Sequence, residues 1–125
     1  MNGNSLFIDT NIALYLLNGD EMIAGLLEGR DVYISFITEL ELLGFQGLEP
    51  SEIPAIESFI EDCIVIELNQ SIKEKTIHIK RKRKMKLPDA IIAASSIYMN
   101  IPLLSADKGF EKLEDIQFIL YEIEQ

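Results

Sequence analysis

Short apolar runs alternate with longer amphipathic stretches along the chain, and this alternation limits the folds that it can adopt. The runs predicted to be strands are residues 6–9, 32–35, 64–68, 103–105 and 118–121. Helical spacing is predicted for residues 10–17, 20–28 and 38–45, from residues 51 and 70 onward, over 89–99 and around 110–113. Strands that alternate with helices favour an α/β fold, a three-layer α/β/α domain with a mostly parallel central sheet. The length fits one domain over residues 1–125.

Several residues are suited to begin or end these helices. Ser35 or Thr38 is a plausible N-cap of the third predicted helix, and Asn69 can cap the helix that follows the third strand. Pro88 suits the first position of a further helix. The run Asn100-Ile101-Pro102 ends that helix, so its boundaries are predicted at both ends.

Four acidic residues follow apolar runs or lie in the opening turns of predicted helices: Asp9, Glu41, Asp89 and Asp107. In a parallel sheet these positions converge on the edge where open α/β folds bind their ligands. Carboxylates gathered there would repel each other and raise their pKa values unless cations neutralised them. The donors are all hard oxygen atoms, and the sequence has no His or Cys cluster for zinc. The pattern therefore predicts a site for Mg²⁺ or Mn²⁺.

Each acidic residue also has an ordinary structural interpretation. Asp9 and Asp107 can cap the helices that follow them, and Glu41 can be a solvated helix charge. Glu39 competes with Glu41, because the two lie about 200° apart on a helix and only one can face the site. Periodicity leaves both assignments open. Asp89 is harder to explain without a partner, because five apolar residues follow it directly.

The net charge of −10 is unevenly distributed. Residues 73–86 hold eight of the eleven basic residues and one acidic residue, so this segment carries +7 and the remainder −17. Ile72, Thr76 and Ile79 are predicted to face inward, which leaves the basic side chains outward on a helix. Such a surface is often just solvated, but it can also hold a phosphate backbone. The candidate RNA-binding residues are Lys80, Arg81, Lys82, Arg83, Lys84 and Lys86.

The rest of the sequence predicts neither a membrane segment nor a second reactive site. The apolar stretches are shorter than the roughly 20 residues that a membrane span needs, and no signal peptide is evident. Cys63 has no partner for a disulfide and is predicted to be a small buried hydrophobic residue, which suggests a reducing, cytoplasmic location. His78 lies on the basic helix, where a surface position is expected. The aromatic residues at core-like spacings are Phe45, Phe59, Tyr98, Phe110 and Phe118.

Four motifs together resemble the PIN domain family, and in particular its VapC-type toxins from prokaryotic toxin–antitoxin pairs. The resemblance covers nearly the whole chain. The motifs are Phe7-Ile8-Asp9-Thr10-Asn11, Thr38-Glu39-Leu40-Glu41-Leu42, Leu87-Pro88-Asp89-Ala90-Ile91-Ile92-Ala93-Ala94 and Leu104-Ser105-Ala106-Asp107-Lys108-Gly109-Phe110.

The resemblance implies a metal-dependent ribonuclease with a Rossmann-like sheet. The matching acidic residues would hold one or two Mg²⁺ or Mn²⁺ ions, and the match selects Glu41 over Glu39. Asn11 and Ser105 match polar positions that orient a ligand or water. The family further implies a homodimer, inhibited by a small antitoxin whose C-terminal segment covers the site, and an RNA substrate. Apolar residues expected to serve the dimer or antitoxin surface are Tyr15, Leu16, Leu17, Ile23, Leu26 and Leu27.

Three other readings can be compared with these motifs. An aspartyl phosphatase needs a second Asp two positions after Asp9, where this chain has Asn11. A receiver-type phosphoacceptor domain needs an Asp at the end of a central strand, but the run 64–68 leads into Asn69. The remaining alternative is a PIN-fold module that binds RNA or protein without cleaving RNA, which retention of all four acidic residues disfavours.

Overall fold

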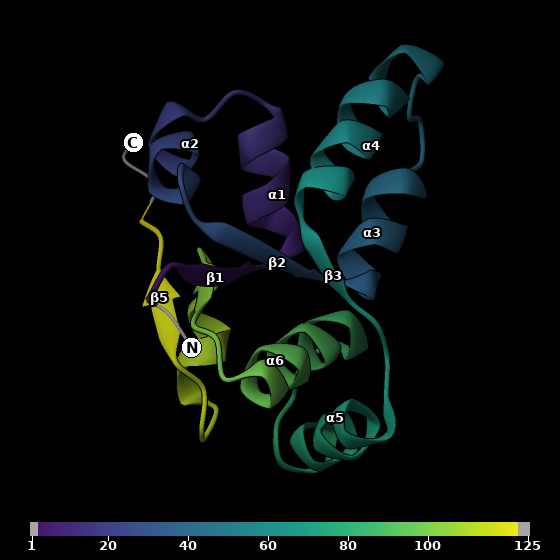
Figure 1. The fold of residues 1–125 in the computed structure, drawn as a ribbon. Coiled ribbons are helices and arrows are strands. Elements are labelled where there is room, and N and C mark those ends of the chain that lie inside the picture. The colour runs from purple at the N-terminus through teal and green to yellow at the C-terminus, as the bar shows by residue number, and fades with distance from the viewer. Residues whose placement is uncertain (1–2, 123–125) are drawn as a thin grey trace.

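A five-stranded sheet lies between two layers of helices in the computed structural model, which describes residues 3–122 (Figure 1). The strands are β1 (Ser5–Ile8), β2 (Asp31–Ser35), β3 (Ile64–Ile66), β4 (Leu103–Ser105) and β5 (Phe118–Leu120). The helices are α1 (Thr10–Leu17), α2 (Glu21–Leu27), α3 (Phe36–Leu43), α4 (Ile53–Asp62), α5 (Gln70–Lys82) and α6 (Leu87–Met99), with 3₁₀ turns η1 (Pro50–Glu52) and η2 (Lys108–Lys112). The predicted three-layer α/β/α class is confirmed.

The strand order determines where a ligand can bind. The sheet runs β3-β2-β1-β4-β5, and every neighbouring pair is parallel. The chain proceeds from β1 outward to β3, then crosses back to place β4 on the other side of β1. The carboxyl ends of β1 and β4 therefore flank a topological switch point, where open α/β sheets bind ligands. Ile8 pairs with Leu104, which brings the residues after both strands together.

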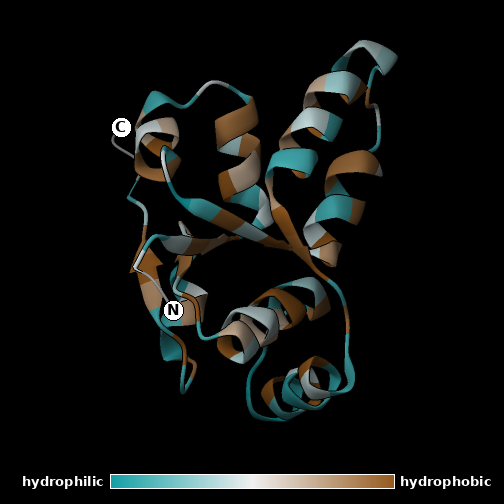
Figure 2. Cartoon of the chain, in the orientation of Figure 1, coloured by the Kyte–Doolittle hydropathy of each residue, from teal (hydrophilic) through white to brown (hydrophobic). Residues whose placement is uncertain are grey.

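Alternate side chains of β1 enter two separate cores. Leu6 and Ile8 pack among α1, α2, α3 and α4, whereas Phe7 packs toward α5 and α6 on the opposite face. All three side chains are 7% exposed or less. Figure 2 shows the hydrophobic stretches along the strands and on the inward faces of the helices. Burial on both faces holds the central strand, and hence the site at its end, in a fixed position.

The helix boundaries agree with most of the expected caps. The side chain of Ser35 accepts a hydrogen bond from the backbone N–H of Ile37, and Asn69 does the same for Ile72. Thr38 is instead buried inside α3, so Ser35 is the cap. Asn100 ends α6 in the left-handed conformation, as expected of a residue that terminates a helix.

Because α3 begins at Phe36, Glu41 lies in the last turn of this helix and not in its early turns. The expected core positions of two aromatic residues are also wrong: Phe45 is 60% exposed and Tyr98 is 50% exposed. Phe45 leaves the core because α3 ends at Leu43. Tyr98 lies near the end of α6, beyond the buried part of that helix.

The apolar residues of α1 and α2 that were expected at a partner surface are not all exposed. Ile23 is fully buried and Leu27 nearly so, in the core beneath α1 and α2, which contradicts their assignment to a partner surface. Leu26 is exposed, and the Tyr15, Leu16 and Leu17 side chains are partly buried against the same core. Only the exposed parts of this group remain available to a partner.

Three expectations about the rest of the chain can also be compared with the structure. Within residues 3–122, none of the helices combines the length and apolar character needed to span a bilayer. Cys63 is half-buried at the edge of the core, where burial, with a smaller contribution from the charge of Asp62, raises the pKa of its thiol to about 12. His78 is exposed, as expected.

Candidate functional site

Asp9 lies directly after β1 and caps α1. Its Oδ1 accepts a hydrogen bond from the backbone N–H of Ile12 at 2.9 Å, and its Oδ2 accepts one from the hydroxyl of Ser105. The side chain is 4% exposed. Burial raises the pKa of Asp9, although the two hydrogen bonds oppose this and the charge of Asp107 adds to it. Asp9 thus combines the predicted cap with a place at the switch point.

Ser105 connects the ends of β1 and β4. Its buried hydroxyl donates to Asp9 and accepts from the backbone N–H of Asp107 at 2.9 Å. Asp107 itself caps η2 through a 2.8 Å hydrogen bond from the backbone N–H of Gly109. A Cβ atom at Gly109 would lie 3.0 Å from the same carboxylate oxygen, so the lack of a side chain there leaves room for the carboxylate. Ser105, which was expected to lie beside the acidic residues, therefore links Asp9 to Asp107 through two hydrogen bonds.

Glu41 reaches the site from α3 through Thr10. The Thr10 hydroxyl donates to Glu41 Oε1 at 2.6 Å and lies 3.0 Å from the hydroxyl of Thr38. Because the single Thr10 hydrogen goes to the carboxylate, Thr38 is the donor of the second bond. This chain of bonds holds an otherwise exposed carboxylate over the start of α1. It also places Glu41 beside the hollow described below, which Glu39 does not line.

Asp89 lies half-buried in the first turn of α6. Burial is the largest cause of its raised pKa, and the negative charges of the other three carboxylates add to the increase. The positive charge of Lys86 opposes them. Asp89 thus lies close enough to Asp9, Glu41 and Asp107 for their charges to raise its pKa.

Two adjacent hollows open around these residues. The first is lined by Asp9, Thr10, Asn11, Leu14, Glu41, Phe45, Lys86, Pro88 and Asp89. The second is lined by Asn11, Lys82, Arg83, Lys84, Met85, Lys86, Asp89, Asp107, Gly109 and Lys112. Asn11, Lys86 and Asp89 belong to both. The structure therefore brings Asn11 and all four acidic residues to one surface, with Ser105 buried behind it.

The basic residues divide into two groups. Lys82, Arg83, Lys84 and Lys86 line the second hollow. Lys80 instead donates a 2.6 Å hydrogen bond to the backbone carbonyl of Met85, and Arg81 lines neither hollow. The carboxylates have no Lys or Arg within ion-pair distance, because the one ion pair formed by residues 3–122 joins Lys75 to Asp115.

The carboxylate oxygens of the site fit a hard divalent cation, but they would not fill all of its coordination positions. In the described part of the chain, no three His, Cys, Asp or Glu side chains are gathered closely enough to hold a metal ion together. Mg²⁺ is bound through one or two carboxylates with water in the remaining positions. Burial and the charges of neighbouring carboxylates raise the pKa values of Asp9 and Asp89, and a bound cation would offset the repulsion from those charges.

Several residues that line or support the site were not predicted from the sequence. Thr10 and Thr38 position Glu41, Phe45 forms an apolar wall, and Lys112 adds a cation from η2. Thr10 follows Asp9 at the start of a helix, which was a local signal for a position near the site. Thr38, Phe45 and Lys112 carried no such signal, because their roles depend on contacts between elements far apart in the sequence.

The chain can also be compared with known proteins. A family model described as PIN domain matches residues 6–116. A toxin-antitoxin complex from Klebsiella pneumoniae contains a chain that is 26% identical, with a TM-score of 0.81 and coverage of 94% of this chain and 99% of the other. A VapBC-1 structure from nontypeable Haemophilus influenzae matches at 28% identity and a TM-score of 0.75, covering 93% and 97%. No match was found among curated proteins.

A further structure shares the fold at lower identity. VapBC2 from Rickettsia felis, bound to a DNA fragment from its promoter, matches with a TM-score of 0.82 at 17% identity, covering 94% and 99% of the two chains. At this identity the similarity concerns the fold alone. The fold similarity thus extends over nearly all of both chains.

Proposed function

Because this chain belongs to the PIN domain family, we propose that it is a metal-dependent ribonuclease, the toxin of a toxin–antitoxin pair. The observation that supports this most is the presence of four carboxylates from four segments around two adjacent hollows at the switch point of the sheet, without a Lys or Arg within ion-pair distance of them among residues 3–122. Cationic side chains adjoin these carboxylates in the second hollow. The combination suits a site that takes both a cation and a polyanion.

Asp9, Glu41, Asp89 and Asp107 are the residues that would hold Mg²⁺ or Mn²⁺. A bound divalent ion would supply Lewis acidity for hydrolysis of a phosphodiester. The remaining tasks belong to the chain. Ser105 and the N-terminus of α1 hold the Asp9 carboxylate in one orientation, and Thr10 holds that of Glu41. Preorganised carboxylates of this kind avoid the cost of ordering them during the reaction.

The basic residues of the second hollow would grip the RNA backbone. Lys82, Arg83, Lys84 and Lys86 lie beside Asp89 and Asp107, so a phosphate that they bind would place the strand next to the carboxylates. Contacts of this type fix the position of a nucleic acid but do not read its sequence. Asn11, which is exposed and lines both hollows, would orient a ligand or water.

We extend the proposal to a homodimer that a small antitoxin inhibits by covering the site. The similarity to a toxin-antitoxin complex from Klebsiella pneumoniae and to VapBC-1 from Haemophilus influenzae supports the antitoxin, and the homodimer is what the family resemblance implies. Light scattering of the purified protein would test the dimer, which predicts twice the chain mass. Leu26 is an exposed apolar residue that remains available for such contacts.

One observation favours a second candidate, a PIN-fold module that binds RNA or protein without cleaving RNA. The described residues do not gather three metal-ligating side chains into one cluster. A module of this kind would bind RNA through the basic surface and would not need a bound metal ion. The two candidates differ in whether RNA is cut, so an activity assay separates them.

The test is cleavage of a mixed structured RNA pool in Mg²⁺ or Mn²⁺, with EDTA and an Asp9→Asn protein as controls. A ribonuclease loses cleavage in both controls. Glu41→Gln and Glu39→Gln form a matched pair on the same helix, and only the first is expected to reduce cleavage. Equal activity of wild type and Asp9→Asn, with both folded, would reject the catalytic proposal for these substrates.

A further inference from the structure

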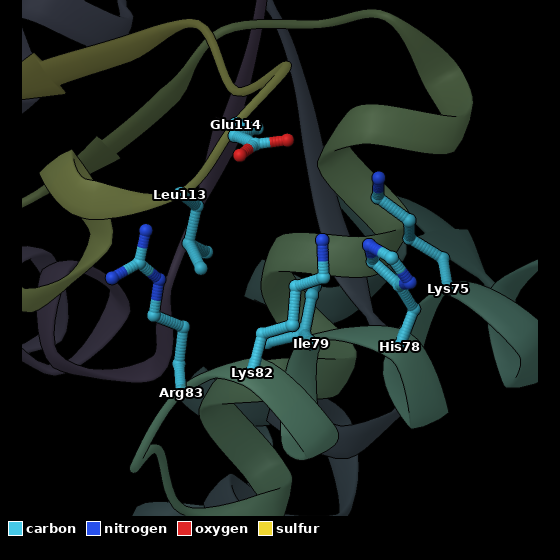
Figure 3. A pocket seen from close by; sticks show the side chains of 7 residues that line it. All are labelled: Lys75, His78, Ile79, Lys82, Arg83, Leu113 and Glu114. Carbon is cyan, nitrogen blue, oxygen red and sulfur yellow. The ribbon is translucent and has the colours of Figure 1, made fainter.

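A third hollow lies on the side of α5 that faces the segment after η2. It is lined by Lys75, His78, Ile79, Lys82, Arg83, Leu113 and Glu114 (Figure 3). In the close-up, the nitrogen-bearing side chains of α5 extend toward Leu113 and Glu114. Ile79 and Leu113 are 4% and 8% exposed, so the base of the hollow is firmly packed. The third hollow therefore combines a rigid apolar base with a polar, nitrogen-rich rim.

The rim carries an excess of positive charge. Residues 75, 78 and 82 follow helical spacing along one face of α5, and Arg83 extends the row at its end. Opposite them stands one carboxylate, that of Glu114. Within residues 3–122, the only ion pair of the rim joins Lys75 to Asp115 at 3.4 Å, so Lys82 and Arg83 have no acidic partner within ion-pair distance. Unpaired cations that converge on a hollow favour an anionic ligand.

The third hollow is continuous with the candidate active site. Lys82 and Arg83 line both the third hollow and the second, which contains Asp89 and Asp107. From Lys82, the row of side chains continues to Lys75 over seven residues of α5, about 10 Å along the helix axis. A polyanion held at the carboxylates therefore meets the unpaired Lys82 and Arg83 first, and then His78 and Lys75, whose ammonium group pairs with Asp115. A chain of phosphates suits such a row better than a single small anion.

We propose that the third hollow is a second phosphate-binding subsite, which holds the backbone of a single-stranded RNA beyond the scissile bond. This inference rests on the proposed function, because the RNA is taken to reach the third hollow from the scissile bond at the carboxylates. Lys75 and His78, which were not among the predicted RNA-binding residues, contact the strand in addition to Lys82 and Arg83. The carboxylate of Glu114 can accept a hydrogen bond from a ribose 2′-hydroxyl, the group that distinguishes RNA from DNA.

The test measures binding of a fluorescein-labelled oligouridylate by anisotropy in EDTA, where cleavage does not occur. Lys75→Gln and His78→Gln proteins are compared with wild type over a range of salt concentrations. Loss of one phosphate contact in a single strand lowers the slope of log Kd against log salt by about 0.7. We expect this change for Lys75→Gln, a smaller one for His78→Gln, and weaker binding in both.

Two control variants separate the subsite from general charge and from folding. Lys73→Gln removes the same charge from the same helix, but residue 73 does not line the third hollow. Asp115→Asn breaks the ion pair of Lys75 and keeps the lysine. Both are expected to retain the wild-type salt slope, and thermal denaturation confirms that all variants are folded.

The outcomes distinguish this inference from the proposed function. An equal effect of Lys73→Gln and Lys75→Gln, or no binding by wild type at low salt, would overturn the subsite. Failure of wild type to cleave any RNA in Mg²⁺ or Mn²⁺ would count against the ribonuclease. In that case, a selective effect of Lys75→Gln on binding would still support a phosphate subsite on an RNA-binding module.

Discussion

Replacing Ser105 by alanine tests whether the ends of β1 and β4 are joined as the structure shows. The substitution removes the donor to the buried Asp9 carboxylate and the acceptor of the Asp107 N–H. Because Ser105 is fully buried and Asp9 is 4% exposed, water cannot readily replace the lost donor. The Asp107 N–H is only part-buried, so water can take the place of its lost acceptor.

The expected magnitude follows from these contacts. A hydrogen bond to a buried charged group contributes about 1.5–3 kcal/mol, so we expect Ser105→Ala to destabilise the metal-free protein by about 2–3 kcal/mol at neutral pH. With an unfolding entropy of about 2.1 cal/mol/K per residue, a chain of 125 residues loses about 8–11 °C in Tm. Thermal and urea denaturation in EDTA would measure both quantities.

The pH dependence gives a sharper check. The hydrogen bond from Ser105 lowers the pKa of Asp9, so its loss raises the folded-state pKa further above the unfolded value. A raised carboxyl pKa destabilises the fold above that pKa, and this contribution disappears as the carboxyl becomes protonated. The cost of Ser105→Ala should therefore be largest at neutral pH and shrink in acid.

A double-mutant cycle with Asp9→Asn should show coupling, because the charged partner of Ser105 is absent from that background. The reasoning is refuted if Ser105→Ala costs less than about 0.5 kcal/mol at neutral pH, which is the range of ordinary surface substitutions. A cost that is independent of both pH and Asp9→Asn would refute it equally.

Three other expectations concern the metal, the glycine beside Asp107 and the thiol. Mn²⁺ at 100 times its Kd should stabilise wild type by about 2.7 kcal/mol. In calorimetry, Asp89→Asn should raise the Tm of the metal-free protein and reduce the shift in Tm that the metal causes. A metal-free Asp89→Asn protein that melts below wild type would contradict the repulsion inferred here. Gly109→Ala places a Cβ 3.0 Å from the Asp107 carboxylate and should lower RNA cleavage by about ten- to a hundred-fold with little loss of Tm; unchanged cleavage would show that the carboxylate does not shift. With its thiol pKa raised to about 12, Cys63 should be alkylated slowly by iodoacetamide at mildly alkaline pH and rapidly after unfolding, as followed by mass spectrometry; equal rates in the two states would contradict this.

Much of the fold was predictable because its signals are local. Apolar runs and helical spacing identify elements without reference to the rest of the chain, and Asn69 and Ser35 cap helices through bonds to residues two or three positions away. Predictions were wrong where an element's end or its neighbours decided burial. Phe45 leaves the core because α3 ends before it, and Ile23 enters the core because α2 packs beside α1.

The two structural interpretations of Asp9 and Asp107 prove compatible with a role in the site. In a parallel α/β fold, the residue after a strand is also the residue before the next helix. A carboxylate there can satisfy free N–H groups with one oxygen and direct the other toward the edge of the sheet. Asp9 does this, using Oδ1 for the cap of α1 and Oδ2 for Ser105. Capping is thus no argument against function at this position.

Glu41 is the case that sequence spacing alone did not decide, and the structure shows why. The Thr10 hydroxyl accepts a hydrogen bond from Thr38 at 3.0 Å and donates one to Glu41 at 2.6 Å. The position of the Glu41 carboxylate therefore depends on contacts between residues 28 and 31 positions apart in the sequence. Thr38 and Glu41 lie three residues apart on α3 and therefore face the same side, toward α1. Glu39 lies on a different side. The packing of α1 against α3 therefore decides whether Glu39 or Glu41 faces the site. The periodicity of one helix does not contain that information.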